Sequence, residues 1–252
     1  MSLDHIWSAA LVATALALSH GVALGSPCAA PPSVWGGFAA LARAKPPLQG
    51  DQALTIVALC SSSTLGTGAS SPDHSYPAQL QSLLERRFPA ASVRVVNRGI
   101  GGETVAANLA RLDRDVLALQ PDLVIWQVGT NDALLAVPPL TVRGELLEGI
   151  ARVRATGADI VLLDPQPLPQ ADRESAVERV RAVLVEVAQT AGVSLLSRHE
   201  LMRYWLDSGQ LDAASLLGPD GLHMTDTSYL CLAERIADLF PPWPGDDAAG
   251  AS

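Results

Sequence analysis

The sequence predicts an α/β protein in which helices cover both faces of a five-stranded parallel sheet, a three-layer α/β/α architecture. Short apolar runs alternate with longer segments of helical spacing, and this alternation is typical of parallel sheets. Each short run is almost entirely apolar, as a strand buried on both faces has to be. The predicted strands are residues 54–59, 93–96, 123–128, 160–163 and 193–196.

Helical spacing is clearest in the segments that follow the first, fourth and fifth predicted strands. Apolar residues recur there every three or four positions, which places them on one face of a helix. They are Leu80, Leu83, Leu84 and Phe88 in the first segment, Val177, Val180, Val183, Leu184 and Val187 in the second, and Leu230, Leu232, Ile236 and Leu239 in a closing helix at residues 225–240.

The chain is predicted to form one domain, residues 51–240, because 252 residues suffice for one full hydrophobic core. Residues 26–50 are rich in Pro, Ala and Gly, and we interpret them as a linker or loosely packed arm. Residues 241–252 repeat Pro, Gly, Asp and Ala, and we interpret them as a flexible tail.

Residues 1–25 are interpreted as an export signal, or signal peptide, which predicts a periplasmic or secreted protein. An apolar stretch from Ile6 to Leu18 leads to a small-x-small cleavage pattern at residues 23–25. The first five residues contain no Lys or Arg, so a membrane-tethered N-terminus is the alternative. Polar residues interrupt the stretch, which is too short for a stable spanning helix.

The charge and the cysteine spacing restrict the classes of partner. The formal net charge is -9 and the 17 Lys and Arg residues are scattered, whereas a nucleic-acid partner requires a clustered basic surface. Cys28, Cys60 and Cys231 have spacings that fit neither a zinc site nor a disulfide framework. We interpret them as two buried thiols and one thiol in a tail.

Small polar residues follow the first two predicted strands. Residues 60–68 form a Ser- and Gly-rich turn, where a serine hydroxyl can be exposed while its backbone N–H faces an oxyanion. The glycines of residues 97–104 allow the backbone to approach a ligand and to present N–H groups. Taken separately, each segment also fits an ordinary turn.

Two more polar motifs complete the candidate site. After the third strand, Asn131 can donate its side-chain amide to an oxyanion, whereas Asp132 is expected to cap the next helix. Before the closing helix, a turn lets Asp220 approach His223, so that the carboxylate orients the imidazole toward a serine. His5 and His20 fall in the predicted signal, and His74 and His199 have no suitably spaced acidic partner in a strand-end loop.

These four motifs, in this order and at these strand ends, resemble the SGNH/GDSL hydrolases over most of the predicted domain. The resemblance implies a flavodoxin-like SGNH hydrolase fold and a serine esterase. It implies Ser62 as the nucleophile, activated by Asp220 and His223. It also implies an oxyanion hole formed by the Ser62 N–H, the Gly102 N–H and the Asn131 amide. This chemistry requires no metal ion and no organic cofactor.

The first motif departs from the family pattern, because Cys60 replaces the usual glycine and Ser61 the usual aspartate. The departure leaves Ser61 and Ser63 as rival nucleophiles to Ser62. The alternatives to an ester hydrolase are an acyltransferase or acetyltransferase that uses the same triad, and an inactive binding module.

The substrate is expected to be a small-molecule or glycan ester, and we favour a small acyl group on a glycan, which an exported protein would meet. Apolar side chains near the strand-end loops are candidates for an acyl pocket, or else belong to the core. They are Trp126, Leu134, Leu168 and Met224. Polar side chains in the loop after the fourth strand are candidates for contact with a sugar. They are Asp164, Gln166 and Gln170.

Overall fold

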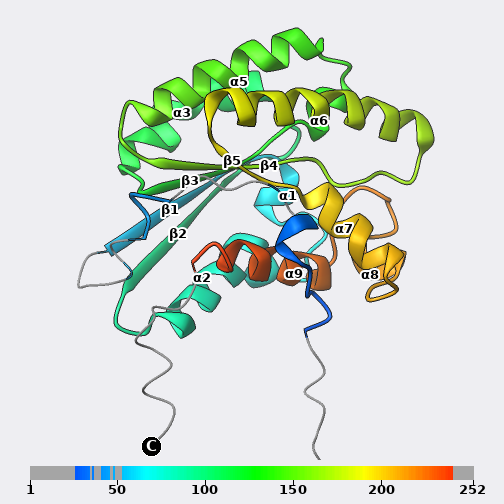
Figure 1. Cartoon of the computed structure of the whole chain (residues 1–252), viewed down its shortest axis with the longest axis horizontal. Coiled ribbons are helices and arrows are strands. Elements are labelled where there is room, and N and C mark those ends of the chain that lie inside the picture. Colours follow the sequence, from blue (N-terminus) through cyan, green and yellow to red (C-terminus); the bar gives the residue numbers. More distant parts are fainter. Residues whose placement is uncertain (1–25, 35, 37–40, 46–47, 49–52, 241–252) are drawn as a thin grey trace, which may run out of the picture.

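The structure is a computed structural model that describes residues 26–34, 36, 41–45, 48 and 53–240. Within these residues, five parallel strands form one sheet in the order β2-β1-β3-β4-β5 (Figure 1). The strands are β1 (Ala53–Cys60), β2 (Ser92–Gly99), β3 (Leu123–Gln127), β4 (Asp159–Leu163) and β5 (Ser194–Leu196). The predicted fold class is therefore confirmed.

Helices pack on both faces of the sheet and complete the three layers (Figure 1). One face is covered by α2 (Tyr76–Arg87), α7 (Arg198–Asp207) and α9 (Asp226–Ala237). The other is covered by α3 (Val105–Asp115), α5 (Pro139–Arg154) and α6 (Ala171–Ala191). Successive strand residues point to opposite faces. In β1, Ile56 therefore joins the first core and Val57 the second, which explains the continuous apolar runs.

Shorter helices lie in the connections between these elements. The α-helical ones are α1 (Ser62–Leu65), α4 (Thr130–Leu134) and α8 (Ala213–Leu216), and the 3-10 turns are η1 (Pro32–Val34), η3 (Pro72–His74) and η4 (Leu117–Leu119). A Cβ added to Gly99 would lie 2.1 Å from Leu65 N, so glycine is required where α1 packs against β2. Because parallel strands end at one edge, the loops after β1, β2 and β3 meet there.

The segment before the domain is attached to it, which corrects the expectation of a loosely packed arm for its described residues. Cys28, Leu41 and Ala44 are buried. Trp205 Nε1 donates a hydrogen bond to the Cys28 carbonyl at 3.1 Å, and Ala44 N donates to the Asp159 carboxylate at 2.9 Å. Apolar burial and hydrogen bonds together therefore hold this segment against the domain.

The cysteine interpretation is wrong for two of the three residues. Cys28 and Cys231 form a disulfide that joins the N-terminal segment to α9. Cys60 is a buried free thiol, as expected. The two half-cystines are 203 residues apart, and no local spacing pattern relates residues at such a distance. The bond therefore depends on the fold as a whole.

Loss of this disulfide is expected to lower the free energy of unfolding substantially. A covalent link across so long a loop restricts the unfolded chain, and the chain-entropy relation gives a stabilisation of about 5 kcal/mol. The variant Cys28→Ala/Cys231→Ala should therefore unfold at a lower denaturant concentration than the oxidised wild type, and at a concentration close to that of the reduced wild type. Equal midpoints for the variant and the oxidised protein would contradict this account.

No helix among the described residues has the length and apolar composition needed to cross a bilayer. The predicted export signal at residues 1–25 and the predicted tail at residues 241–252 lie outside the described residues.

Candidate active site

Ser62 lies where β1 gives way to α1, at the carboxyl edge of the sheet. The neighbouring Ser61 and Ser63 are buried, with 2% and 3% of their surface exposed, whereas Ser62 is partly exposed. Within the described part of the chain, neither the N–H nor the hydroxyl of Ser62 has a hydrogen-bond partner. Of these three serines, Ser62 is therefore the one that can meet a ligand.

Cys60 has a backbone conformation that suits glycine better than other residues. Its φ is 151°, a positive value that favours glycine. Burial raises the pKa of its thiol to about 12. Because the thiolate is the nucleophilic form, Cys60 is unreactive at neutral pH, and it does not compete with Ser62.

The loop after β2 approaches Ser62 through its glycines. Ile100 N donates to the Cys60 carbonyl at 2.8 Å, which continues the sheet pairing by one bond. A Cβ added to Gly101 would lie 4.0 Å from Ser62 Cβ. Gly102 is exposed and has a φ of 80°, and its N–H makes no hydrogen bond to any described residue. The Gly102 N–H is thus free to bind a ligand.

Asn131 reaches the same edge from the start of α4, the short helix that follows β3. Its Nδ2 donates to the Glu103 carbonyl at 2.8 Å, next to Gly102. An amide nitrogen carries two hydrogens, so the second N–H remains for a ligand. The three predicted oxyanion donors, Ser62, Gly102 and Asn131, therefore lie on the ends of three adjacent strands.

Asp132 does not cap the helix that follows it, which corrects the sequence prediction. It lies buried inside α4, and its Oδ1 accepts a hydrogen bond from Val105 N at 3.1 Å, at the start of α3. Burial raises the pKa of this carboxyl. Asp132 therefore joins the loop that carries Asn131 to the helix that follows the glycine loop.

A buried ion pair that sequence reasoning missed supports the glycine loop. The Glu103 carboxylate accepts from Arg111 Nη2 at 2.5 Å and from Asn108 Nδ2 at 2.6 Å. The same Arg111 nitrogen donates to the Arg98 carbonyl at 2.8 Å and to the Cys60 carbonyl at 3.3 Å. Glu103 precedes α3 whereas Arg111 lies within it, so helical periodicity gives no signal for the pair.

Asp220 and His223 form a hydrogen-bonded pair in the loop before α9, across a turn at Gly221. Asp220 Oδ2 lies 2.6 Å from His223 Nδ1, and Oδ1 accepts from the N–H groups of Leu222 and His223, both at 3.0 Å. These bonds, above all the one from the His223 N–H, lower the pKa of Asp220 to about 2. The carboxylate is thus ionised at neutral pH and orients the imidazole.

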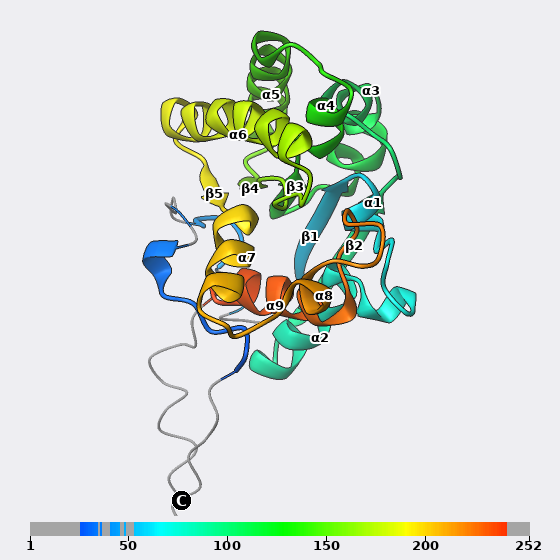
Figure 2. The ribbon, with the colours of Figure 1, turned by 90° about the vertical axis from the view of Figure 1, so that its right-hand side faces the viewer.

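The loop that carries His223 packs against the loop that carries Ser62. A Cβ added to Gly68 would lie 3.0 Å from His223 Cβ and 2.6 Å from the Met224 carbonyl oxygen. Thr67 N donates to the Ser62 carbonyl at 2.9 Å, one residue before Gly68. Figure 2 shows the α8–α9 loop, in orange, beside the cyan segment that follows α1.

The other two described histidines also have acidic partners, which lie on helices α6 and α9. His199 Nε2 lies 2.7 Å from Glu174 Oε1, which α6 supplies. His74 Nδ1 lies 2.9 Å from Asp226 Oδ2. The Ser70 hydroxyl contacts that same His74 nitrogen while it donates to Asp226. Since one nitrogen faces both neighbours, His74 cannot relay a proton between them as a triad histidine does.

Among the described residues, Glu174, Glu178 and His199 offer ligand atoms within 4.8 Å of one another, as a metal site would require. Arg181 Nη1 donates to both Glu178 oxygens at 2.9 Å, so a cation already occupies this carboxylate. The group belongs to α6 and α7 and is not part of the loops around Ser62.

Two predicted apolar contacts belong to the core instead of a substrate pocket. Trp126 is fully buried, and its Nε1 donates to Asn108 Oδ1 at 2.9 Å. Met224 is fully buried in the core beneath α7 and α9. Leu134 is half-buried, and Leu168 is buried.

Two predicted sugar contacts also point inward. Asp164 is buried and accepts from Arg181 Nε at 2.9 Å, from Ser197 Oγ at 2.7 Å and from His199 N at 3.0 Å. Gln166 is fully buried and bonded on both sides of its amide. These two side chains are therefore structural, because their polar atoms have protein partners.

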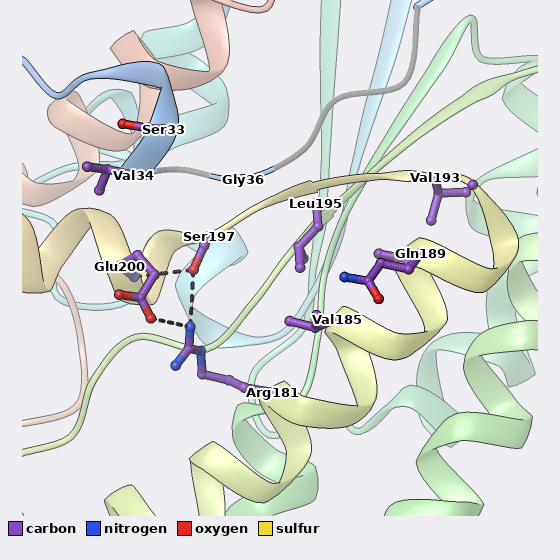
Figure 3. Close-up of a pocket in the computed structure, with 12 residues that line it drawn as sticks. Ser33, Val34, Gly36, Arg181, Val185, Gln189, Val193, Leu195, Ser197 and Glu200 are labelled. Atoms are coloured by element: carbon purple, nitrogen blue, oxygen red, sulfur yellow. Dashed lines mark hydrogen bonds and ion pairs between the residues drawn. The ribbon is translucent and has the colours of Figure 1, made fainter.

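Two cavities among the described residues are lined in part by α6 and α7, and both lie outside the loops that carry Ser62, Gly102, Asn131 and His223. The larger, about 570 Å³, opens between η1, α6 and the edge strand β5, with Arg181, Ser197 and Glu200 bonded to one another at one end (Figure 3). A smaller cavity of about 240 Å³ is lined mainly by apolar residues of α7, α8 and the loop after β4, Leu168 among them.

Comparisons with known proteins identify the family of the chain. The model of the Non-GDSL lipase-like family matches residues 27–240. An arylesterase of Vibrio mimicus is 33% identical over 176 residues, which cover 69% of this chain and 82% of that enzyme. An acetylxylan esterase of Geobacillus stearothermophilus is 43% identical over 68 residues, 27% of this chain and 28% of that one.

Solved structures give the same fold. A two-domain esterase active on acetylated mannans superposes with a TM-score of 0.67 at 23% identity, over 82% of this chain and 54% of that one. The family match spans nearly all of the described domain, and the relatives are ester hydrolases. The chain belongs to the Non-GDSL lipase-like family and is an ester hydrolase of the SGNH/GDSL type.

Proposed function

We propose that Ser62, His223 and Asp220 form a catalytic triad that hydrolyses carboxylic esters through an acyl-enzyme. One observation carries the proposal. Ser62 is accessible between two buried serines, its N–H is free, and its loop packs on the loop in which Asp220 holds His223. A nucleophile, a base and an orienting carboxylate in neighbouring loops are the parts that this chemistry needs.

In the first half-reaction, His223 Nε2 takes the Ser62 proton as Oγ attacks the ester carbonyl carbon. The Ser62 N–H, the Gly102 N–H and the free Asn131 N–H stabilise the oxyanion. His223 then returns the proton to the leaving alcohol, and the acyl group stays on Oγ. In the second half-reaction, His223 deprotonates a water that attacks the acyl-enzyme, and the carboxylic acid leaves as Ser62 regains its proton.

Exposed apolar side chains around the site favour an ester with an apolar acyl group. They stand on the segments that follow β1, β2 and β3, and they are Leu65, Ile100 and Leu135, between 46% and 67% exposed. We call these three residues the apolar rim. Leu135 N donates to the Asn131 carbonyl at 2.8 Å, which ties the rim to an oxyanion donor. Ordered apolar groups beside a nucleophile stabilise an acyl chain by removing it from water.

Hydrolysis of a glycan acetate is the second candidate, and the acetylxylan esterase among the relatives favours it. The polar contacts expected for a sugar are weaker than the sequence indicates, because Asp164 and Gln166 have internal partners. Gln170 stays exposed, close to Gly221. Acetate release from acetylated xylan, measured beside simple esters, separates the two substrates. Product analysis with an added acceptor alcohol tests the acyltransferase alternative.

The apolar rim predicts that butyrate esters are cleaved more efficiently than acetate esters. Two more methylenes, when partly buried, should raise kcat/KM about tenfold. The measurement is p-nitrophenyl acetate and butyrate hydrolysis by the wild type and Leu135→Asn. The matched control is Leu206→Asn, an exposed leucine of α7. A preference for acetate that Leu135→Asn leaves unchanged would argue against the rim as an acyl site.

Export is also proposed, and the Cys28–Cys231 disulfide supports it independently of residues 1–25, because such bonds persist in oxidising compartments. Fusion of residues 1–25 to a reporter that is active only outside the cytoplasm tests the proposal. An inactive fusion that is well expressed would contradict it.

A further inference from the structure

We propose that Gln166 is a positioning residue that holds His223 and Asn131 in register, and this inference rests on the proposed roles of those two residues. Gln166 follows β4 by three positions and is fully buried. Among the described residues, its side chain makes no hydrogen bond to the loop that carries Ser62 or to the Asp220 carboxylate. Its effect on the reaction would pass through the backbone of the loops that carry the reacting groups.

The orientation of the Gln166 amide is fixed by its partners. Arg198 Nη2 donates to Oε1 at 2.6 Å, and Nε2 donates to the Leu222 carbonyl at 2.6 Å. Arginine can only donate and a carbonyl can only accept, so the amide has a single arrangement that satisfies both. The hydroxyl of Thr130 adds a longer bond to Oε1, at 3.3 Å.

The two loop contacts of Gln166 fall beside catalytic positions. Leu222 directly precedes His223, and Thr130 directly precedes Asn131. The buried Gln166 amide thus links the loop that carries His223 to the segment that carries Asn131. The Asp220 side chain, on the other side of the His223 loop, is 51% exposed. On the inner side of this loop, the hydrogen bond from Gln166 Nε2 to the Leu222 carbonyl holds the backbone.

Arg198 makes a polar residue necessary at this place. Its guanidinium is fully buried and reaches the Asp164 carbonyl, Met224 Sδ and Gln166 Oε1. Burial lowers the pKa of Arg198. The Asp164 carboxylate is occupied by other donors, so the Gln166 oxygen is one of few acceptors for this charge, and an apolar residue would leave it unpaired.

The test is Gln166→Glu in the full chain. Glutamate keeps the shape and the acceptor for Arg198, but it sets a carboxylate oxygen against the Leu222 carbonyl in place of a donor. We expect kcat to fall about 10- to 100-fold, because small misplacements of reacting groups have effects of this size. KM should stay within about twofold, since Gln166 does not touch substrate. The unfolding midpoint should not fall, because the new charge pairs with Arg198.

Three results would overturn the inference: an unchanged kcat in the folded variant, a raised KM with kcat intact, which is the behaviour of a substrate contact, or a lower unfolding midpoint with normal kcat. If Gln166→Glu folds poorly, Gln166→Asn replaces it in the test. This variant keeps the amide but is one methylene shorter, so it should also show a lowered kcat with a nearly unchanged KM. Gln189→Glu on α6 controls for added charge. Activity that survives Ser62→Ala would instead refute the proposed function itself.

Discussion

Substitution of Ser62 by alanine is expected to lower kcat by about four to six orders of magnitude, the loss usual for a serine nucleophile. Without Oγ no acyl-enzyme forms, and the remaining donors stabilise only direct attack by water. The measurement is p-nitrophenyl butyrate hydrolysis, with circular dichroism to establish that the variant is folded. Ser62 is partly exposed and makes no side-chain hydrogen bond to the described residues, so the fold should tolerate the change.

Ser63→Ala is the matched control, because Ser63 is adjacent to Ser62 but buried. It should keep kcat within about tenfold of the wild type. A larger loss of kcat in Ser63→Ala than in Ser62→Ala would identify Ser63 as the nucleophile and contradict the assignment.

Substitution of Asp220 by asparagine is expected to lower kcat by about two to four orders of magnitude. An asparagine amide can turn its N–H toward Nδ1 and so favour the wrong histidine tautomer. We expect a loss below that of a buried triad aspartate, because Asp220 is half exposed and water can replace part of its role. The matched control is Asp226→Asn, which removes a carboxylate from the surface pair with His74 and should leave kcat nearly unchanged.

The pH dependence follows from the pKa of Asp220, which the His223 N–H, the His223 side chain and the Leu222 N–H lower to about 2. A lowered pKa in the folded state means that the carboxylate's stabilising contribution is present above its ordinary value and is lost as the pH falls through about 2. Protonation of Asp220 should therefore not shape the wild-type rate profile above about pH 4. Titration of the Asp220 carboxyl above about pH 4, followed by NMR, would contradict this assignment.

The sheet was predictable because burial on both faces leaves a strong local signal. The runs at residues 123–127 and 160–163 are fully buried, and the sequence identifies both strands within one residue. The edge strand β2 extends to Gly99, three residues past its predicted end. Its last residues are half-exposed and polar, so apolar runs alone cannot delimit it.

The candidate site was predictable where its groups stand at strand ends. Ser62, Gly102 and Asn131 follow three adjacent strands, and Asp220 reaches His223 across a local turn. Residues whose partners come from distant segments were not. The sequence cannot show that Gln166 faces Leu222, because this contact depends on how β4 and the α8–α9 loop pack together.

The same limitation explains the missed partner of His199 and the misread cysteines. The acidic partner of His199 lies on another helix, α6, and Cys28 reaches Cys231 only because the N-terminal segment lies against α9. Each of these pairings requires tertiary structure that brings separate elements together, and a pattern of residue spacing contains no information about it.

The most direct test of the central claim is covalent labelling of the wild-type protein with a fluorophosphonate, with the modified residue located by mass spectrometry. The account predicts one label, on Ser62, that forms at a rate lowered in Asp220→Asn and is absent from Ser62→Ala. A label on Ser61 or Ser63, or a folded protein that hydrolyses esters while no serine is labelled, would contradict it.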